Sequence, residues 1–78
     1  MDFIKKKVRQ FQEKKLDEIL DEIQFHEHVK NQLERKITGM MNPEVDEIKK
    51  EISSNKKMIK IWKRNEEKIR KQMKDMEN

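Results

Sequence analysis

Apolar residues recur every three and four positions along the second half of this 78-residue chain, and this spacing restricts the fold more than any other feature. The repeat occupies ten positions: Val45, Ile48, Ile52, Asn55, Ile59, Trp62, Glu66, Ile69, Met73 and Met76. Only Asn55 and Glu66 among them are polar. A repeat of about 3.5 residues places these side chains along one side of an α-helix, as in a coiled coil. We therefore predict a long helix over residues 43–76.

The first half of the chain carries the same repeat in two segments. One segment reads Ile19, Ile23, His26, Lys30, Leu33, Ile37 and Met40, and the segment before it reads Ile4, Val8, Phe11 and Lys15. The step from Lys15 to Ile19 is four residues where three would keep the phase, a stutter that locally unwinds a supercoil. We predict a helix over residues 3–38, with its apolar seam running through both segments.

A single break separates the two repeats, at "TGMMNPE" in residues 38–44. Gly39 can adopt the left-handed conformation that closes a helix. Asn42 is a good N-cap, and Pro43 suits the first position of the next helix. We therefore predict a loop over residues 39–42. The chain has no other Gly or Pro, which excludes an all-β fold with its frequent turns.

Folding the second helix back through this loop gives an antiparallel hairpin, in which facing residues have positions that add to a nearly constant value. The predicted facing pairs are Ile37 with Val45, Leu33 with Ile48, Ile23 with Ile59, Ile19 with Trp62, Val8 with Met73, His26 with Asn55, and Lys15 with Glu66. Polar residues thus meet polar residues in the register that aligns the apolar ones. We predict an all-α fold, with residues 1–78 forming one antiparallel two-helix coiled-coil hairpin.

A two-helix seam leaves its core side chains half exposed, and other apolar residues lie off the seam altogether. These are Phe3, Leu20, Phe25, Met41, Met58 and Ile61. A second copy would cover them in a four-helix bundle with two-fold symmetry. A partner protein could serve instead. A monomeric three-helix arrangement, with the first helix broken near the stutter, is the structural alternative.

This architecture predicts a small non-enzymatic interaction protein, such as an adaptor, inhibitor or assembly factor, that acts through helix faces as a homo-oligomer, with a dimer favoured. The candidate partner-binding residues are Leu20, Phe25, Met58, Ile61 and Trp62, although Trp62 also fits the seam. The sequence has no Gly-rich phosphate loop and no nucleophile in a recognisable setting, and a slender hairpin offers no concave pocket. We expect neither catalysis nor a cofactor.

The charge distribution supports an alternative function. Residues 1–16 and 56–78, which meet at the open end of the hairpin, carry fifteen basic and six acidic groups, whereas residues 17–55 carry five basic and ten acidic groups. A nucleic-acid-binding regulator could use this basic end. The residues concerned are Lys5, Lys6, Lys7, Arg9, Lys56, Lys57, Lys60, Lys63, Arg64, Arg70 and Lys71. The same pattern also fits a solvated charged surface, or an antiparallel dimer that matches basic to acidic ends.

Two histidines raise the question of a metal site. His26 and His28 point about 200° apart on a helix, so they cannot chelate one ion. Glu22 and His26 are four residues apart and could share a ligand, but a hydrogen bond between His26 and Asn55 in a register-fixing polar layer explains His26 better. We predict no metal site.

The segment "DFIKKKVRQF" at residues 2–11 has the pattern of a basic amphipathic helix that could lie on an anionic bilayer. Its apolar face is also the predicted continuation of the seam, so we do not expect membrane binding. The sequence has no Cys, no apolar run of the about 18 residues needed for a membrane span, and no secretory signal. These features predict a cytoplasmic protein, and the abundance of Lys, Ile and Asn suits a low-GC bacterium or its phage.

Overall fold

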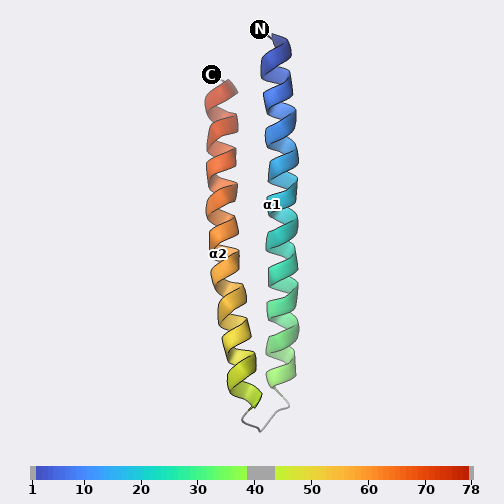
Figure 1. Cartoon of the computed structure of the whole chain (residues 1–78), viewed down its shortest axis with the longest axis vertical. Helices are drawn as coiled ribbons and strands as arrows, with labels where there is room; N and C mark the ends of the chain where they lie inside the picture. The colour runs from blue at the N-terminus through green and yellow to red at the C-terminus, as the bar shows by residue number, and fades with distance from the viewer. Residues whose placement is uncertain (1, 39–43, 78) are drawn as a thin grey trace.

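The structure, a computed structural model, describes residues 2–38 and 44–77. Helix α1 spans Asp2–Ile37 and helix α2 spans Glu44–Glu77. The helices lie side by side and run in opposite directions, forming a rod of 62 × 14 × 13 Å (Figure 1). The predicted all-α hairpin is confirmed. Because α1 is continuous through Lys15, the three-helix alternative is wrong.

The expectations for Gly39, Asn42 and Pro43 fall on residues outside the described ranges. The helix ends that are described lie one residue from their predicted positions.

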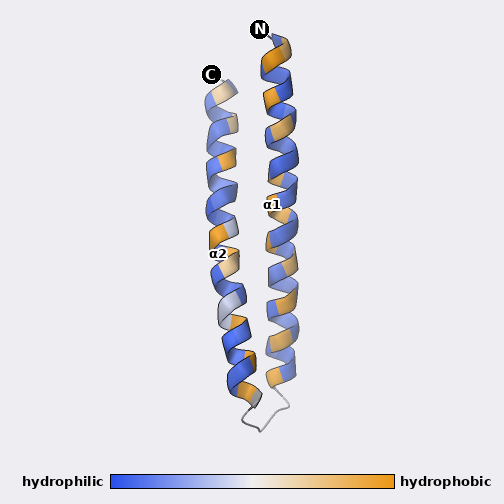
Figure 2. Cartoon of the chain, in the orientation of Figure 1, coloured by the Kyte–Doolittle hydropathy of each residue, from blue (hydrophilic) through white to orange (hydrophobic). Residues whose placement is uncertain are grey.

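Apolar residues recur along both helices among a majority of hydrophilic ones (Figure 2). The helices are therefore held together by a narrow seam.

The most buried part of the seam lies in the middle of the rod. Ile19 and Ile23 of α1 and Ile52 and Ile59 of α2 are all buried, and Ile19 is only 2% exposed. All four occupy predicted seam positions. Burial of such side chains is worth about 1.5–3 kcal/mol each, so this cluster is the main apolar contribution to the pairing of the helices.

A polar layer crosses the seam beside these isoleucines. The His26 ring nitrogen Nδ1 lies 2.8 Å from Asn55 Oδ1, and Asn55 Nδ2 donates to the Glu51 carbonyl oxygen at 2.9 Å. The two side chains belong to α1 and α2, so the predicted facing of His26 with Asn55 is confirmed, and with it the register at this point.

The N-terminal part of α1 differs from the prediction. Phe11 is 68% exposed, whereas the neighbouring Gln12 is only 7% exposed. Ile4 and Val8 are exposed as well. The prediction that Ile4 and Phe11 continue the seam is therefore wrong. Val8 is only 37% exposed, and its facing with Met73 stays a prediction. Met73 lines a groove with residues such as Gln12.

The stutter explains this difference. Helix α1 keeps the phase set by Ile19, and seven residues before Ile19 stands Gln12. Phe11 is one residue away from that position, and one residue rotates a side chain by about 100° around the helix axis. Ile4 and Phe11 therefore turn out of the interface, and Gln12 packs against α2 in place of Phe11.

The predicted facing of Lys15 with Glu66 stays a prediction. Glu66 accepts a hydrogen bond from Arg70 Nε at 2.8 Å on its own helix. In the ranges that the structure describes, no ion pair joins Lys15 to Glu66. Lys15 is exposed and borders a shallow groove with Asn65 and Lys68.

Candidate interaction surface

One ion pair between the helices marks one long side of the rod. Lys63 Nζ of α2 lies 3.7 Å from Glu27 Oε1 of α1. We call this side the charged flank. Side chains two positions apart on a helix point about 200° apart. Phe25 precedes Glu27 by two residues and Ile61 precedes Lys63 by two, so each points away from the charged flank, toward the outer side of its own helix.

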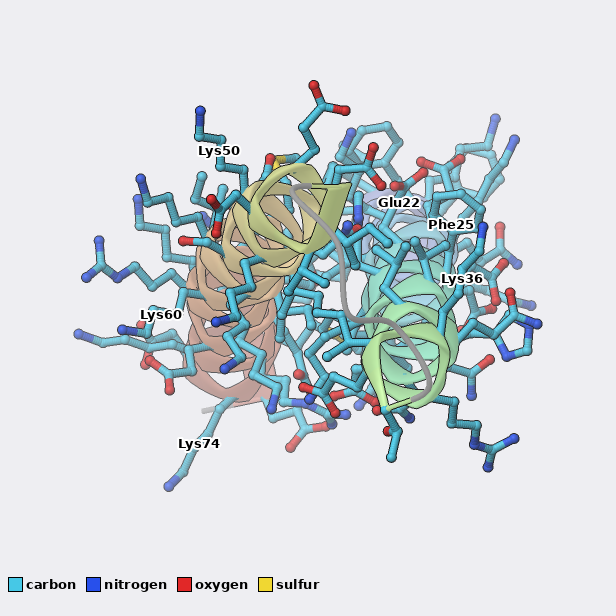
Figure 3. All side chains as sticks on the ribbon, turned by 90° about the horizontal axis from the view of Figure 1, so that it is seen from below. Glu22, Phe25, Lys36, Lys50, Lys60 and Lys74 are labelled. Carbon is cyan, nitrogen blue, oxygen red and sulfur yellow. The ribbon has the colours of Figure 1, made fainter. Side chains whose placement is uncertain are left out.

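Exposed apolar side chains stand on both helices outside the charged flank. Phe25 is 60% exposed and Ile61 is 49% exposed. Phe25 reaches outward from α1 with Glu22 on the same side (Figure 3), and its ring meets the His26 ring edge to face, with centroids 5.3 Å apart. Half-buried Met58 stands three residues before Ile61 and adjoins it on α2. We call Phe25, Met58 and Ile61 the central patch.

The structure does not bring all five sequence-predicted partner-binding residues onto one surface. Leu20 is half-buried and stands seven residues before Glu27, so it lies on the charged flank. Trp62 is half-buried and follows the seam, where its indole Nε1 is buried without a hydrogen-bond partner within the protein. The remaining three, Phe25 of α1 and Met58 and Ile61 of α2, stand outside the charged flank.

A second apolar surface was missed by sequence reasoning. It comprises Phe3, Ile4, Val8 and Phe11, all exposed, and we call it the N-terminal patch. The sequence placed Ile4, Val8 and Phe11 in the seam. The one signal that could have revealed their exposure was the stutter before Ile19. On α1 the two patches are separated by exposed Lys14, Lys15, Glu18 and Glu22.

The basic residues proposed for nucleic-acid contact are all exposed. Some have acidic neighbours: Arg9 pairs with Glu77, Lys63 with Glu27, and Arg70 with Glu66. At the open end a groove of about 410 Å³ lies between the helices. Its lining combines Asp2, Lys5, Lys6, Arg9 and Gln12 of α1 with Met73, Met76 and Glu77 of α2. This end therefore presents mixed charge with a cationic excess.

His26 also approaches a carboxylate. Its Nε2 lies 3.6 Å from Glu22 Oε2, one turn earlier on α1. Because Asn55 Oδ1 can only accept, His26 Nδ1 is the donor in their hydrogen bond, which leaves Nε2 turned toward Glu22. Across residues 2–38 and 44–77, no three His, Asp or Glu side chains are grouped so that they could hold a metal ion.

No family model, curated protein or solved structure matches this chain. Over the part of the chain described by the structure, neither helix has a stretch that is both long and apolar enough to cross a bilayer. The roles proposed below rest on the exposure, charge and packing of the chain's own side chains.

Proposed function

We propose that this chain is a non-enzymatic protein-interaction module that pairs with a second copy of itself through the central patch. The observation that supports this proposal is the exposure of two large apolar side chains in the middle of the rod, Phe25 on α1 and Ile61 on α2. Two hairpins joined there would form a four-helix bundle with two-fold symmetry, in which each copy covers the patch of the other. The dimer would then present its remaining helix faces to further protein partners.

The size of the particle in solution tests the proposal. Light scattering at micromolar concentration should give twice the 9.7 kDa mass of the chain. The double variant Phe25→Ser with Ile61→Ser should return a monomer, because it removes the apolar contacts from both helices. Phe3→Ser is the matched control, since Phe3 is exposed but lies outside the central patch, and it should leave the dimer intact.

Two results would contradict self-association. One is a monomer at all micromolar concentrations with helical circular dichroism intact. The other is a dimer that tolerates the double substitution. A monomer that binds a different protein, and loses that protein when Phe25 and Ile61 are changed, would keep the interaction surface but replace the second copy as its occupant.

The exposed cations at the open end support a second candidate function, the binding of nucleic acid. Contacts to phosphate release counterions, so the affinity would fall steeply as salt rises. A gel-shift titration at several salt concentrations should show this slope, and Lys5→Glu with Lys6→Glu should weaken binding without changing the helical content. If wild-type protein shows no binding at physiological salt, this candidate is excluded.

A further inference from the structure

We infer that the N-terminal patch is a docking surface for anionic lipid bilayers, separate from the central patch and independent of self-association. Phe3, Ile4, Val8 and Phe11 would enter the headgroup region, and the surrounding lysines would contact lipid phosphates. A basic amphipathic helix that lies in the plane of a bilayer has this composition.

The first step is that Phe3, Ile4 and Phe11 stand out of the contact with α2. Gln12 is the residue of this segment that packs into the seam, and it is nearly fully buried. Phe3 and Phe11 are each 68% exposed, and Ile4 is 67% exposed. The sequence predicted no membrane binding because it placed the apolar face of this segment in the seam. Since the side chains of that face are exposed, that reason no longer applies.

The second step is the placement of a lysine within the patch. Phe3, Lys7 and Phe11 follow one another at intervals of four, so Lys7 stands between the two aromatic rings on one ridge of the helix. Its Nζ lies 4.9 Å from the centre of the Phe3 ring. A protein partner that covered both rings would bury this ammonium group, at a high cost unless a carboxylate met it. At a bilayer its stem can lie along apolar surface while its charge reaches the phosphates.

The third step is the charge around the patch. Residues 2–15 carry six basic and two acidic groups, and the basic ones include exposed Lys14 and Lys15 just beyond Phe11. Each basic group near an anionic leaflet adds to binding. A second copy presenting the same patch across a two-fold axis would bring like charges together. The observations therefore favour an anionic lipid surface over a second copy as the occupant.

The position of the patch makes contact feasible. It occupies about three turns of α1 at the open end of the rod (Figure 1), and its side chains are exposed. A planar surface can meet this side without displacing α2 or the isoleucine core. Docking there requires no rearrangement of the hairpin.

Co-sedimentation with lipid vesicles tests the inference on the full chain. The protein should bind vesicles of phosphatidylcholine mixed with phosphatidylserine, bind vesicles of phosphatidylcholine alone far more weakly, and dissociate at high salt. Phe3→Ser with Phe11→Ser should weaken binding about tenfold or more, because it removes the two largest apolar groups of the patch. The control His28→Ser removes an exposed ring that lies outside both patches, and it should leave vesicle binding unchanged.

A second measurement reports insertion directly. In Trp62→Phe with Phe3→Trp, the single tryptophan stands in the patch, and its emission should shift to the blue on addition of anionic vesicles. Absence of wild-type binding to anionic vesicles, equal binding to neutral vesicles, or equal loss in His28→Ser would overturn the inference. The inference would also be overturned if Phe3→Ser with Phe11→Ser abolished self-association but left lipid binding intact. None of the vesicle results bears on the dimer, which the mass measurement decides separately.

Discussion

His26 Nδ1 lies 2.8 Å from Asn55 Oδ1 and so joins the two helices by a hydrogen bond within the seam. The bond has a definite direction, because the imidazole nitrogen donates and the amide oxygen accepts. The amide nitrogen of Asn55 is satisfied at the Glu51 carbonyl oxygen. A slip of either helix by one heptad would bring each side chain opposite a residue that cannot complete this arrangement. The layer therefore opposes registers that a repetitive apolar seam alone would tolerate.

A double-mutant cycle measures the energy of this layer. Asn55→Leu leaves the half-buried His26 without its acceptor and should cost about 1–2 kcal/mol, because an unpaired polar group retains its desolvation penalty. His26→Leu should cost a similar amount. The double variant should recover much of the loss, which gives a coupling energy of about 1 kcal/mol. Urea denaturation followed by circular dichroism at one protein concentration provides the values. Strict additivity of the two single changes would show that the bond does not stabilise the fold.

The contrast between Ile19 and Ile4 tests which stripe of α1 is the core. Ile19 is 2% exposed and Ile4 is 67% exposed, although the sequence repeat contains both. Ile19→Ala should therefore destabilise the hairpin by about 2–4 kcal/mol. Ile4→Ala should change stability by less than about 0.5 kcal/mol. The urea midpoints of the two variants measure these losses of stability. Equal destabilisation would mean that Ile4 packs against α2 as Ile19 does.

Much of the hairpin was predictable because its signals are local and repeated. The single break after Thr38, the heptad spacing of Ile52 and Ile59, and the match of His26 with Asn55 all indicate the same antiparallel register. The phase before the stutter was not predictable by the same reasoning. Two outcomes were open there: the helices could unwind to keep Phe11 inside, or α1 could keep its phase and bury Gln12. The choice between them depends on the energy needed to distort the supercoil, and the spacing of apolar residues gives no information about that energy.

The interaction surfaces were predicted only in part for a related reason. Phe25 and Ile61 lie off the seam in sequence and are exposed in the structure, so periodicity sufficed to find them. Leu20 also lies off the seam, yet its place on the charged flank follows only from the Glu27–Lys63 ion pair across the helices. Which residues lie on the same side of a hairpin depends on how its two helices are placed relative to each other. The apolar pattern of one helix alone does not determine this.

The ion pair of Lys63 with Glu27 should contribute little to stability. Its side chains are 57% and 45% exposed, so water and salt screen the attraction. Lys63→Gln should lower stability by less than about 0.5 kcal/mol. Adding sodium chloride should reduce the difference between wild type and variant further. A loss well above that size in urea denaturation would show that the charged flank holds the helices together more strongly than its exposure suggests.

Gln12→Leu should make the hairpin more stable. Gln12 is 7% exposed, and its Oε1 is buried without a hydrogen-bond partner within the protein. A buried amide oxygen in this state costs about 1–3 kcal/mol, and leucine has similar size without that penalty. The groove beside it is already lined by Met73 and Met76, which suit an apolar neighbour.

We therefore expect the variant to gain about 1 kcal/mol, seen as a higher urea midpoint with an unchanged slope. The matched control is Gln10→Leu, because Gln10 is exposed two residues earlier on the same helix and its substitution should leave the midpoint unchanged. If Gln12→Leu destabilises the hairpin, or if both substitutions have the same effect, Gln12 does not occupy the seam. The outward turn of Phe11, on which the lipid-docking surface depends, would then be wrong as well.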